Sequence, residues 1–368
     1  MAKQIAKKKI LIYGMSNNAG GVEAFIKNAY TNLDAQRYEL HFCCFEKPGA
    51  NYDCLVEKGH KVHTVIKGRH NYFAYRRFWN CFFKTNKFDA VINNACDIVS
   101  NDLLKFAKKH GVATRILHSH NSGNQVVMNP LHKLEERINK LTLGKYVTHY
   151  WACSQIAGEW MFGSRPFTVI KNGIDTSAYM YSPKTRDEYV QLFDSNKRIG
   201  FVGRLSAQKN PLLAVDAFCE YNKKFPDAKL YFVGEGEIKQ QIIHKANALG
   251  VGDKVVLLGR RNDVNKLMSF FDCLIMTSDF EGLPFVLVEA QASGLPCVVI
   301  DNVSAESKLS DLVTFVKNDA PLSLWADEIK NALSTNPQRE KYCNIVKDKG
   351  FDIKTTVRQI DDILGGNI

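Results

Sequence analysis

The segment from Ser278 to Ala290 combines two glutamates with a helix start, and this combination suits a phosphorylated sugar. Pro284 marks the start of a helix, because proline at the first helical position loses no hydrogen bond. Glu281 lies in the glycine-containing turn before this start, and Glu289 lies inside the helix. The free N–H groups of a helix start bind phosphate. With a carboxylate on each side to hold hydroxyl groups, the segment predicts a nucleotide-sugar ligand. The alternative is that Glu281 complements the helix terminus and Glu289 is solvated.

Two cations follow the first strand of the second half of the chain. Arg204 comes directly after Gly203, Lys209 follows, and Pro211 opens the next helix. A guanidinium binds phosphate oxygens as a bidentate fork, and an ammonium adds a point charge. An arginine and a lysine in a loop are usually ordinary surface residues. Beside the two-glutamate segment, we interpret them as a clamp on a diphosphate.

A glycine pair and a histidine pair follow two strands of the first half. Gly20 and Gly21 precede a helix, which permits a close approach of backbone to ligand, although a tight turn explains them equally well. They match neither the dinucleotide-binding fingerprint nor the P-loop. His118 and His120 end a strand on one side of it, and His120 is placed to bond a sugar hydroxyl or a developing charge. The alternatives are a structural histidine and a metal site, for which no third ligand is evident nearby.

The elements that must position these residues follow the same rhythm in each half. Short apolar runs alternate with longer stretches of helical character. Strands are predicted at 8–14, 38–45, 61–66, 89–94, 114–120, 150–154 and 166–175, and again at 197–205, 228–234, 254–259, 273–278 and 296–300. This alternation is typical of βαβ units with a parallel sheet. We therefore predict an α/β protein with two Rossmann-like, doubly wound domains that face each other across a cleft.

Length and composition support this organisation. The 368 residues exceed one ordinary core and predict domains at 1–180 and 181–350, with a tail at 351–368 that packs back on the first. A composition of 45% hydrophobic and 24% charged residues excludes disorder, and no apolar run is long enough to cross a bilayer. The ten cysteines lack metal-ligand spacing, which indicates reduced thiols in a cytoplasmic protein.

Positive charge is concentrated in the first half. Residues 1–180 hold 25 Lys and Arg against 13 Asp and Glu, a net charge of +12, whereas residues 181–368 have a net charge of −1. A basic half suits an anionic partner. The stretch 67–87 mixes basic and aromatic residues, as do helices that lie on anionic membranes, although core packing with a solvated face explains it at least as well. No RNA-recognition motif is present, so no nucleic acid is expected.

In their order along the chain, these segments resemble the retaining glycosyltransferases of family 4, which have the GT-B architecture. The likeness covers nearly the whole chain and is most specific in the spacing of Glu281 and Glu289, with Ser-Gly-Leu-Pro following at 293–296. The stretch His-Ser-His-Asn at 118–121 is similar to the bacterial exopolysaccharide and capsule branch. Further agreement lies at 171–175, 203–205 and 233–236.

The resemblance implies a role for each matching residue. Arg204 and Lys209 would neutralise the donor diphosphate, Glu289 would bind ribose hydroxyls, and Glu281 would bind the donor sugar. With His120 near the reacting centre, the implied catalytic set is His120, Glu281, Arg204 and Lys209. Further donor contacts are implied for Gly21, Arg261, Gly282 and Leu283. The chain has no Asp-x-Asp motif, so neither a metal nor another cofactor is expected.

The implied activity is retaining transfer of a sugar from a nucleotide-sugar donor, a UDP-sugar, in the synthesis of surface polysaccharide. The acceptor would be a glycan or a polyprenyl-diphosphate-linked oligosaccharide, and the enzyme would act in the cytoplasm or peripherally on the inner face of the cell membrane. Two other functions fit the same architecture: a non-hydrolysing nucleotide-sugar epimerase and a non-catalytic sugar-nucleotide-binding subunit. A hydrolase built on the two glutamates would leave Arg204 and Lys209 unexplained.

Overall fold

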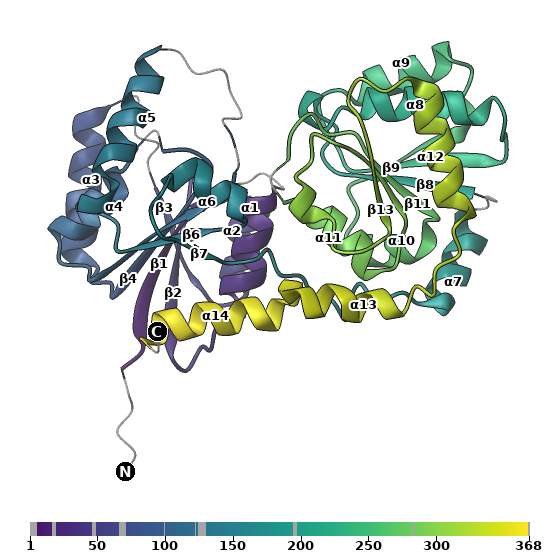
Figure 1. Cartoon of the computed structure of the whole chain (residues 1–368). Coiled ribbons are helices and arrows are strands. Elements are labelled where there is room, and N and C mark those ends of the chain that lie inside the picture. Colours follow the sequence, from purple (N-terminus) through teal and green to yellow (C-terminus); the bar gives the residue numbers. More distant parts are fainter. Residues whose placement is uncertain are drawn as a thin grey trace. The chain divides into compact units, whose positions relative to one another are not determined.

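The computed structural model describes residues 6–16, 20–45, 49–65, 71–98, 100–121, 123, 130–193, 197–281 and 283–366. The chain divides into two compact units, Met1–Gly173 with Lys354–Ile368 and Ile174–Ile353. Each unit is built around one parallel sheet with helices packed on its two faces (Figure 1). The predicted Rossmann-like architecture of both halves is therefore confirmed.

The sheet of the first unit has the strand order β3-β2-β1-β4-β5-β6-β7. Its strands are β1 (Lys8–Met15), β2 (Tyr38–Cys44), β3 (Lys61–Thr64), β4 (Ala90–Ala95), β5 (Thr114–Ser119), β6 (His149–Ala152) and β7 (Thr168–Val169). Its helices are α1 (Gly21–Phe25), a π-helical continuation (Ile26–Tyr30), α2 (Ala50–Glu57), α3 (Tyr72–Thr85), α4 (Asp102–Lys109), α5 (Pro130–Thr142) and α6 (Gln155–Phe162). The order reverses between β1 and β4, so loops after these strands diverge there and leave room for a ligand.

The sheet of the second unit has the strand order β10-β9-β8-β11-β12-β13. Its strands are β8 (Lys197–Val202), β9 (Ala228–Val233), β10 (Val255–Gly259), β11 (Cys273–Met276), β12 (Cys297–Ile300) and β13 (Val313–Val316). Its helices are α7 (Pro183–Phe193), α8 (Pro211–Asn222), α9 (Lys239–Ala248), α10 (Val264–Phe270), α11 (Phe285–Ala292), α12 (Leu322–Ser334) and α13 (Lys341–Val346). The reversal here falls between β8 and β11.

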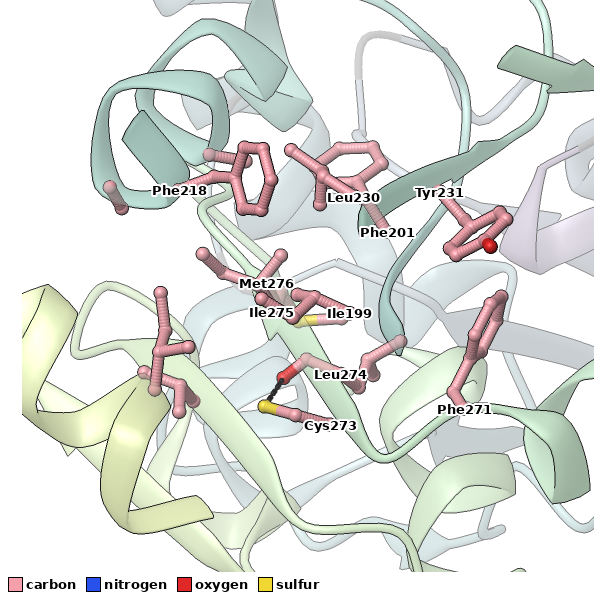
Figure 2. Close-up of a cluster of buried hydrophobic side chains, with 14 of the residues drawn as sticks. Ile199, Phe201, Phe218, Leu230, Tyr231, Phe271, Cys273, Leu274, Ile275 and Met276 are labelled. Carbon is pink, nitrogen blue, oxygen red and sulfur yellow. Dashed lines mark hydrogen bonds between the residues drawn. The ribbon is translucent and has the colours of Figure 1, made fainter. Parts of the chain in front are cut away.

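The core of the second unit lies between its central strands and the helices that cover them. Figure 2 shows side chains of β8, β9 and β11 packed with Phe218 of α8 and with Phe271, which follows α10. The strands are apolar along their length because both faces of a parallel sheet are covered. This continuous core fixes the ends of β8 and β11, from which the candidate site is built.

The end of the chain folds with the first unit. Helix α14 (Ile353–Gly365) buries Ile360 and Leu364. The Nζ of Lys8 donates to the carbonyl oxygen of Leu364 at 2.8 Å, and the Thr356 hydroxyl donates to the carbonyl oxygen of Lys171 at 3.0 Å. The division into units falls after Gly173 and after Ile353, whereas the sequence predicts domain ends at 180 and 350.

Most of the basic aromatic stretch at 67–87 forms helix α3; its residues 67–70 lie outside the described part. Trp79, Phe82 and Phe83 of this helix are buried in the core of the first unit. Among the large apolar residues of this helix, only Tyr72 and Phe73 at its start are exposed, by 53% and 84%. Among the helices of the described residues, none combines the length and apolar character needed to cross a bilayer.

Candidate active site

The loops after β8 and β11 meet at the reversal of the second sheet. The backbone N–H of Asp279 donates to the carbonyl oxygen of Gln208 at 2.8 Å, and the Thr277 hydroxyl donates to that of Asn210 at 2.8 Å. Asn210 adopts a left-handed backbone (φ 45°) and caps α8, while its Nδ2 donates to Asp279 Oδ1 at 3.1 Å. Doubly wound sheets bind ligands at such a reversal, so the two loops form the natural floor of a site.

Lys209 and Glu281 form an ion pair across this junction, through Nζ and Oε1. Their side chains are only 21% and 12% exposed, so the pair is largely shielded from water. Shielding strengthens charge interactions, because the effective dielectric constant falls with burial. The structure therefore brings together two of the residues that the sequence predicts for one site.

Arg204 lies in the same loop as Lys209, and its side chain is exposed. Among the residues that the structure describes, it takes part in no ion pair, which leaves its guanidinium available to an anion. The loop after β9 holds the Arg204 loop in place through two backbone hydrogen bonds. The N–H of Leu205 donates to the carbonyl oxygen of Glu235 at 3.0 Å, and that of Gly203 donates to Val233 at 3.0 Å.

Glycine is required where these two loops touch. Gly234 has a positive φ of 143°, and a Cβ atom there would lie 1.9 Å from the carbonyl oxygen of Gly203. A Cβ atom at Gly236 would lie 2.1 Å from the carbonyl oxygen of Leu205. Both contacts are with backbone, which cannot move aside without moving Arg204. The motif at 233–236 is thus a support for the cation loop.

Helix α11 carries Glu289, whose side chain is partly buried. Removal from water raises the pKa of this carboxyl to about 7, and a hydrogen bond from the Tyr179 hydroxyl offsets part of that increase. The alternative reading of Glu289 as a solvated residue is therefore wrong. The helix begins at Phe285, with Pro284 as its N-cap, one residue later than the sequence predicts. Leu283 is buried before this start, and Gly282 lies outside the described residues.

Arg261 follows β10 and is already engaged by a carboxylate. Its Nε donates to Asp263 Oδ1 at 2.8 Å and its Nη2 donates to Oδ2 at 2.6 Å. The Tyr189 hydroxyl also hydrogen-bonds to Asp263. The bond from Arg261 holds the pKa of Asp263 down at about 2, so this carboxylate stays charged. If Arg261 contacts the donor as predicted, it would therefore use the edge or face of its guanidinium that Asp263 leaves open.

In the first unit, His118 and His120 lie side by side, with ring centroids 4.0 Å apart, as strand alternation predicts. His118 is completely buried, and neither of its ring nitrogens has a hydrogen-bond partner in the described structure. His120 is partly exposed, and its Nε2 lies 3.0 Å from Asn94 Oδ1. Only His120 is therefore within reach of a ligand.

The glycine pair of the first unit borders a polar cluster. Gly21 begins α1, and a Cβ atom at Gly20 would lie 2.5 Å from Oε2 of the buried Glu23. The Ser16 hydroxyl donates to the other oxygen of this carboxylate. At Gly20, the small residue thus makes room for the Glu23 carboxylate, a structural role that the sequence does not predict. Residues 17–19 lie outside the described part, and so does any contact that Gly21 makes through them.

Three residues outside the predicted set hold predicted site residues in place: Tyr179, Asp263 and Asn94. Tyr179 and Asn94 are far in sequence from the residues they bind, so no local pattern announces the contact. Asp263 is two residues from Arg261, a spacing that could have indicated the pair. Across the described residues, no three His, Cys, Asp or Glu side chains are grouped to hold a metal ion.

Comparison with family models accounts for most of the chain. Residues 19–178 match the model described as Glycosyltransferase Family 4, and residues 184–349 match the model described as Glycosyl transferases group 1. The two matches divide the chain close to the boundary between the two units.

Relatives match over nearly the whole length. EpsF of Bacillus subtilis (strain 168), provisionally named a glycosyltransferase, is 26% identical over 96% of this chain and 95% of its own. CapH of Staphylococcus aureus, a capsular polysaccharide biosynthesis glycosyltransferase, is 23% identical over 94% of this chain and 95% of its own. The UDP-Gal:α-D-GlcNAc-diphosphoundecaprenol α-1,3-galactosyltransferase of Escherichia coli is 28% identical over 53% of each chain.

Solved structures share the fold. HepE of Anabaena, in complex with UDP, superposes with a TM-score of 0.78 at 20% identity, over 98% of this chain and 100% of that one. WaaG, a glycosyltransferase involved in lipopolysaccharide biosynthesis, gives a TM-score of 0.74 at 16% identity, over 97% of this chain and 100% of that one. At these identities the likeness establishes the fold.

Proposed function

Because the chain belongs to the family 4 glycosyltransferases, an enzyme family with the GT-B fold, we propose that it transfers a hexosyl or N-acetylhexosaminyl group from a UDP-sugar, with retention of configuration. The acceptor is a glycan or a polyprenyl-diphosphate-linked oligosaccharide in surface polysaccharide synthesis. The names of its relatives support this: CapH serves capsular polysaccharide biosynthesis, and the Escherichia coli enzyme is named for a UDP-galactose donor and a diphosphoundecaprenol-linked sugar.

The observation that carries the proposal is the junction of Lys209 and Glu281 at the sheet reversal, with Arg204 exposed in the same loop. A diphosphate leaving group gains negative charge as its bond to the sugar breaks. Cations fixed beforehand at that position stabilise the charge, which is usually the largest catalytic contribution. In this proposal, Arg204 and Lys209 bind the diphosphate, Glu281 binds the sugar and Glu289 binds the ribose.

We propose front-face transfer as the route to retention. The bond between the anomeric carbon and the diphosphate oxygen breaks, and the acceptor hydroxyl oxygen bonds to that carbon on the same face. The hydroxyl proton passes to the departing phosphate oxygen. Because Arg204 and Lys209 supply the positive charge, the proposal includes no metal and no other cofactor. Glu281 and Glu289 bind hydroxyl groups here and are not an acid and nucleophile pair.

A lipid-linked acceptor places the enzyme at the inner face of the cell membrane, and helix α3 offers a contact there. Phe73 exposes 84% of its surface, and Arg76 and Arg77 are exposed beside it. Near an anionic surface, each basic residue contributes about 1 kcal/mol. We expect flotation with anionic vesicles but not with neutral ones, and weaker flotation for Phe73→Ala and for Arg76→Ala with Arg77→Ala. If the Phe73 and Arg76/Arg77 variants floated as well as a Phe225→Ala control, the result would contradict this contact.

Donor binding is tested by thermal unfolding with a panel of UDP-, GDP- and ADP-sugars. A ligand present at a hundred times its Kd adds about 2.7 kcal/mol to the stability of the folded protein. We expect one or more UDP-sugars to raise Tm in the wild type, and the increase to be much smaller in Arg204→Ala and Lys209→Ala. Lys224→Ala, at an exposed lysine of the same unit, is the control. An unchanged Tm with every UDP-sugar would refute the donor assignment.

A further inference from the structure

At the reversal of the first sheet, one buried amide is bonded on three sides. Asn94 of β4 donates from Nδ2 to the carbonyl oxygen of Tyr13 at 2.9 Å. Its Oδ1 lies 3.0 Å from the Tyr30 hydroxyl and 3.0 Å from Nε2 of His120. Gly14 permits the close approach of β1 to β4, because a Cβ atom at this position would lie 2.5 Å from the backbone carbonyl oxygen of Asn94. The side chain is 5% exposed, so water does not compete for these bonds.

The orientation of this amide follows from what its neighbours are able to do. A backbone carbonyl oxygen only accepts, so the atom of Asn94 that faces Tyr13 must be the NH₂ group. The atom that faces Tyr30 and His120 is then the amide oxygen, which also only accepts. Both neighbours must therefore donate to it. A flipped amide would set two carbonyl oxygens against each other.

We propose that Asn94 is a positioning residue that fixes His120 as the tautomer protonated at Nε2, so that the ring meets a substrate only as a hydrogen-bond acceptor, through Nδ1. A neutral imidazole carries one N–H and one lone pair, and the bond to Asn94 uses the N–H. The lone pair at Nδ1 is what remains for a ligand.

The surroundings keep the ring neutral. The His118 ring lies against it, and the Phe25 ring centroid is 5.0 Å away. Tyr30 is buried, and burial raises the pKa of its hydroxyl, so it contributes no negative charge. Removal from water lowers the pKa of His120 to about 3. A charged ring would need two protons, and among the described residues no carboxylate hydrogen-bonds to it to favour the second.

This assignment selects the substrate group that His120 binds, and in that respect it rests on the proposed function. An acceptor at Nδ1 pairs with a hydroxyl or an N–H group and not with a phosphate oxygen. In this proposal, His120 therefore contacts a hydroxyl of the donor or acceptor sugar and not the diphosphate. The ring also supplies no proton to the leaving group.

The direct test is the ¹⁵N spectrum of histidine-labelled protein without ligand, in which protonated and lone-pair ring nitrogens are clearly separated. For His120, identified by its loss in His120→Gln, we expect the protonated nitrogen to be Nε2 throughout the neutral pH range. A proton at Nδ1, or a mixture of tautomers, would overturn the proposal. This measurement requires neither substrate nor activity.

Two variants examine the role of Asn94. Asn94→Asp places a carboxylate beside Nε2, and we expect the pKa of His120 to rise by roughly 1–3 pH units. Tyr30→Phe leaves both other bonds of Asn94 in place and is the matched control, with the tautomer retained. An unchanged His120 titration in folded Asn94→Asp, or loss of the tautomer in Tyr30→Phe, would refute the mechanism.

Activity separates this inference from the proposed function. With the best UDP-sugar of the thermal panel, Asn94→Asp should raise KM increasingly as pH falls and the ring takes its second proton, whereas Tyr30→Phe should follow the wild-type profile. If the tautomer is Nε2–H but no UDP-sugar is bound or turned over, the proposed function fails and the assignment of the tautomer stands. If sugar transfer occurs but the proton is at Nδ1, the proposed function stands and the assignment of the tautomer fails.

Discussion

The Tyr179 hydroxyl donates a hydrogen bond to the Glu289 carboxylate and so joins the segment that opens the second unit to helix α11. Tyr179 becomes harder to ionise in this position: burial and the nearby carboxylate both raise the pKa of its phenol. Tyr179 is therefore a fixed donor, and Glu289 keeps its other lone pairs for a ligand. The pair is a defined structural feature on which the pH dependence of binding can be tested.

We expect the affinity for UDP to depend on the ionisation of Glu289. Ribose hydroxyls donate to the carboxylate form, and its pKa is about 7. Binding should therefore weaken about tenfold between pH 8 and pH 6, as the ionised fraction falls. Glu289→Gln should bind more weakly at pH 8 and show no pH dependence. Isothermal titration with UDP at both pH values measures this, and a flat wild-type profile would disprove the ribose contact.

The same carboxyl should affect stability. Its folded pKa exceeds the ordinary glutamate value of 4.5, so the folded state favours the protonated form. The resulting stabilisation is complete below about pH 4.5 and is lost as pH rises through 7, by on the order of 1 kcal/mol per pH unit. Glu289→Gln should remove this slope from urea unfolding measured at pH 5 and pH 7.5. An equal slope in the variant would assign it to other groups.

Lys209 and Glu281 should respond differently to substitution. Lys209→Ala removes a charge-assisted contact worth roughly 1.5–3 kcal/mol, so the Kd for UDP should rise about 10- to 100-fold. Glu281→Gln releases the Lys209 ammonium, so UDP should bind as tightly as in the wild type or more tightly, while turnover of the UDP-sugar falls. Equal losses of UDP affinity in both variants would mean that Glu281 serves the diphosphate site and not the sugar.

The glycine at 234 should be intolerant of substitution. Gly234→Ala places a Cβ atom 1.9 Å from the Gly203 carbonyl oxygen, in addition to the cost of its positive φ. Gly250→Ala is the matched control, because its φ is +71° and a Cβ atom there meets nothing within 4 Å. The control should lose about 1 kcal/mol and Gly234→Ala considerably more, as measured by urea unfolding. Equal losses would indicate that the two loops separate easily.

Substitution of His118 and of His120 should affect stability and turnover differently. His118→Leu removes two ring nitrogens that have no partner in the described structure, so the variant should be at least as stable as the wild type. It should also retain transfer activity. His120→Leu should fold but lose turnover, because the acceptor at Nδ1 is gone. The reverse result, with an inactive His118→Leu, would place His118 in the site.

Sequence patterns located the strands well because a parallel strand covered on both faces is a continuous apolar run. For this reason the strand predicted at 8–14 nearly coincides with β1, whereas the strand predicted at 197–205 extends three residues beyond the end of β8. Strand β13 was missed, because a four-residue edge strand leaves almost no pattern and the segment was assigned to a mostly helical tail. The strand predicted at 166–175 is reduced to Thr168–Val169.

The candidate site was predictable in its loops but not in its partners. Cations after one strand and glutamates around a helix start are local signals, and the fold places Lys209 against Glu281 by joining neighbouring strands. The bonds from Tyr179 to Glu289 and from Asn94 to His120 depend on tertiary placement. Neither residue type is unusual where it stands, so the sequence alone could not select them.

The C-terminal helix has a consequence for how the protein is made. Helix α14 supplies buried Ile360 and Leu364 to the first unit, yet it is synthesised after the entire second unit. The first unit therefore emerges from the ribosome with one of its helices still missing. We expect a fragment that stops before Lys354 to leave an apolar surface on the first unit uncovered, and the nascent chain to need protection until α14 has been synthesised.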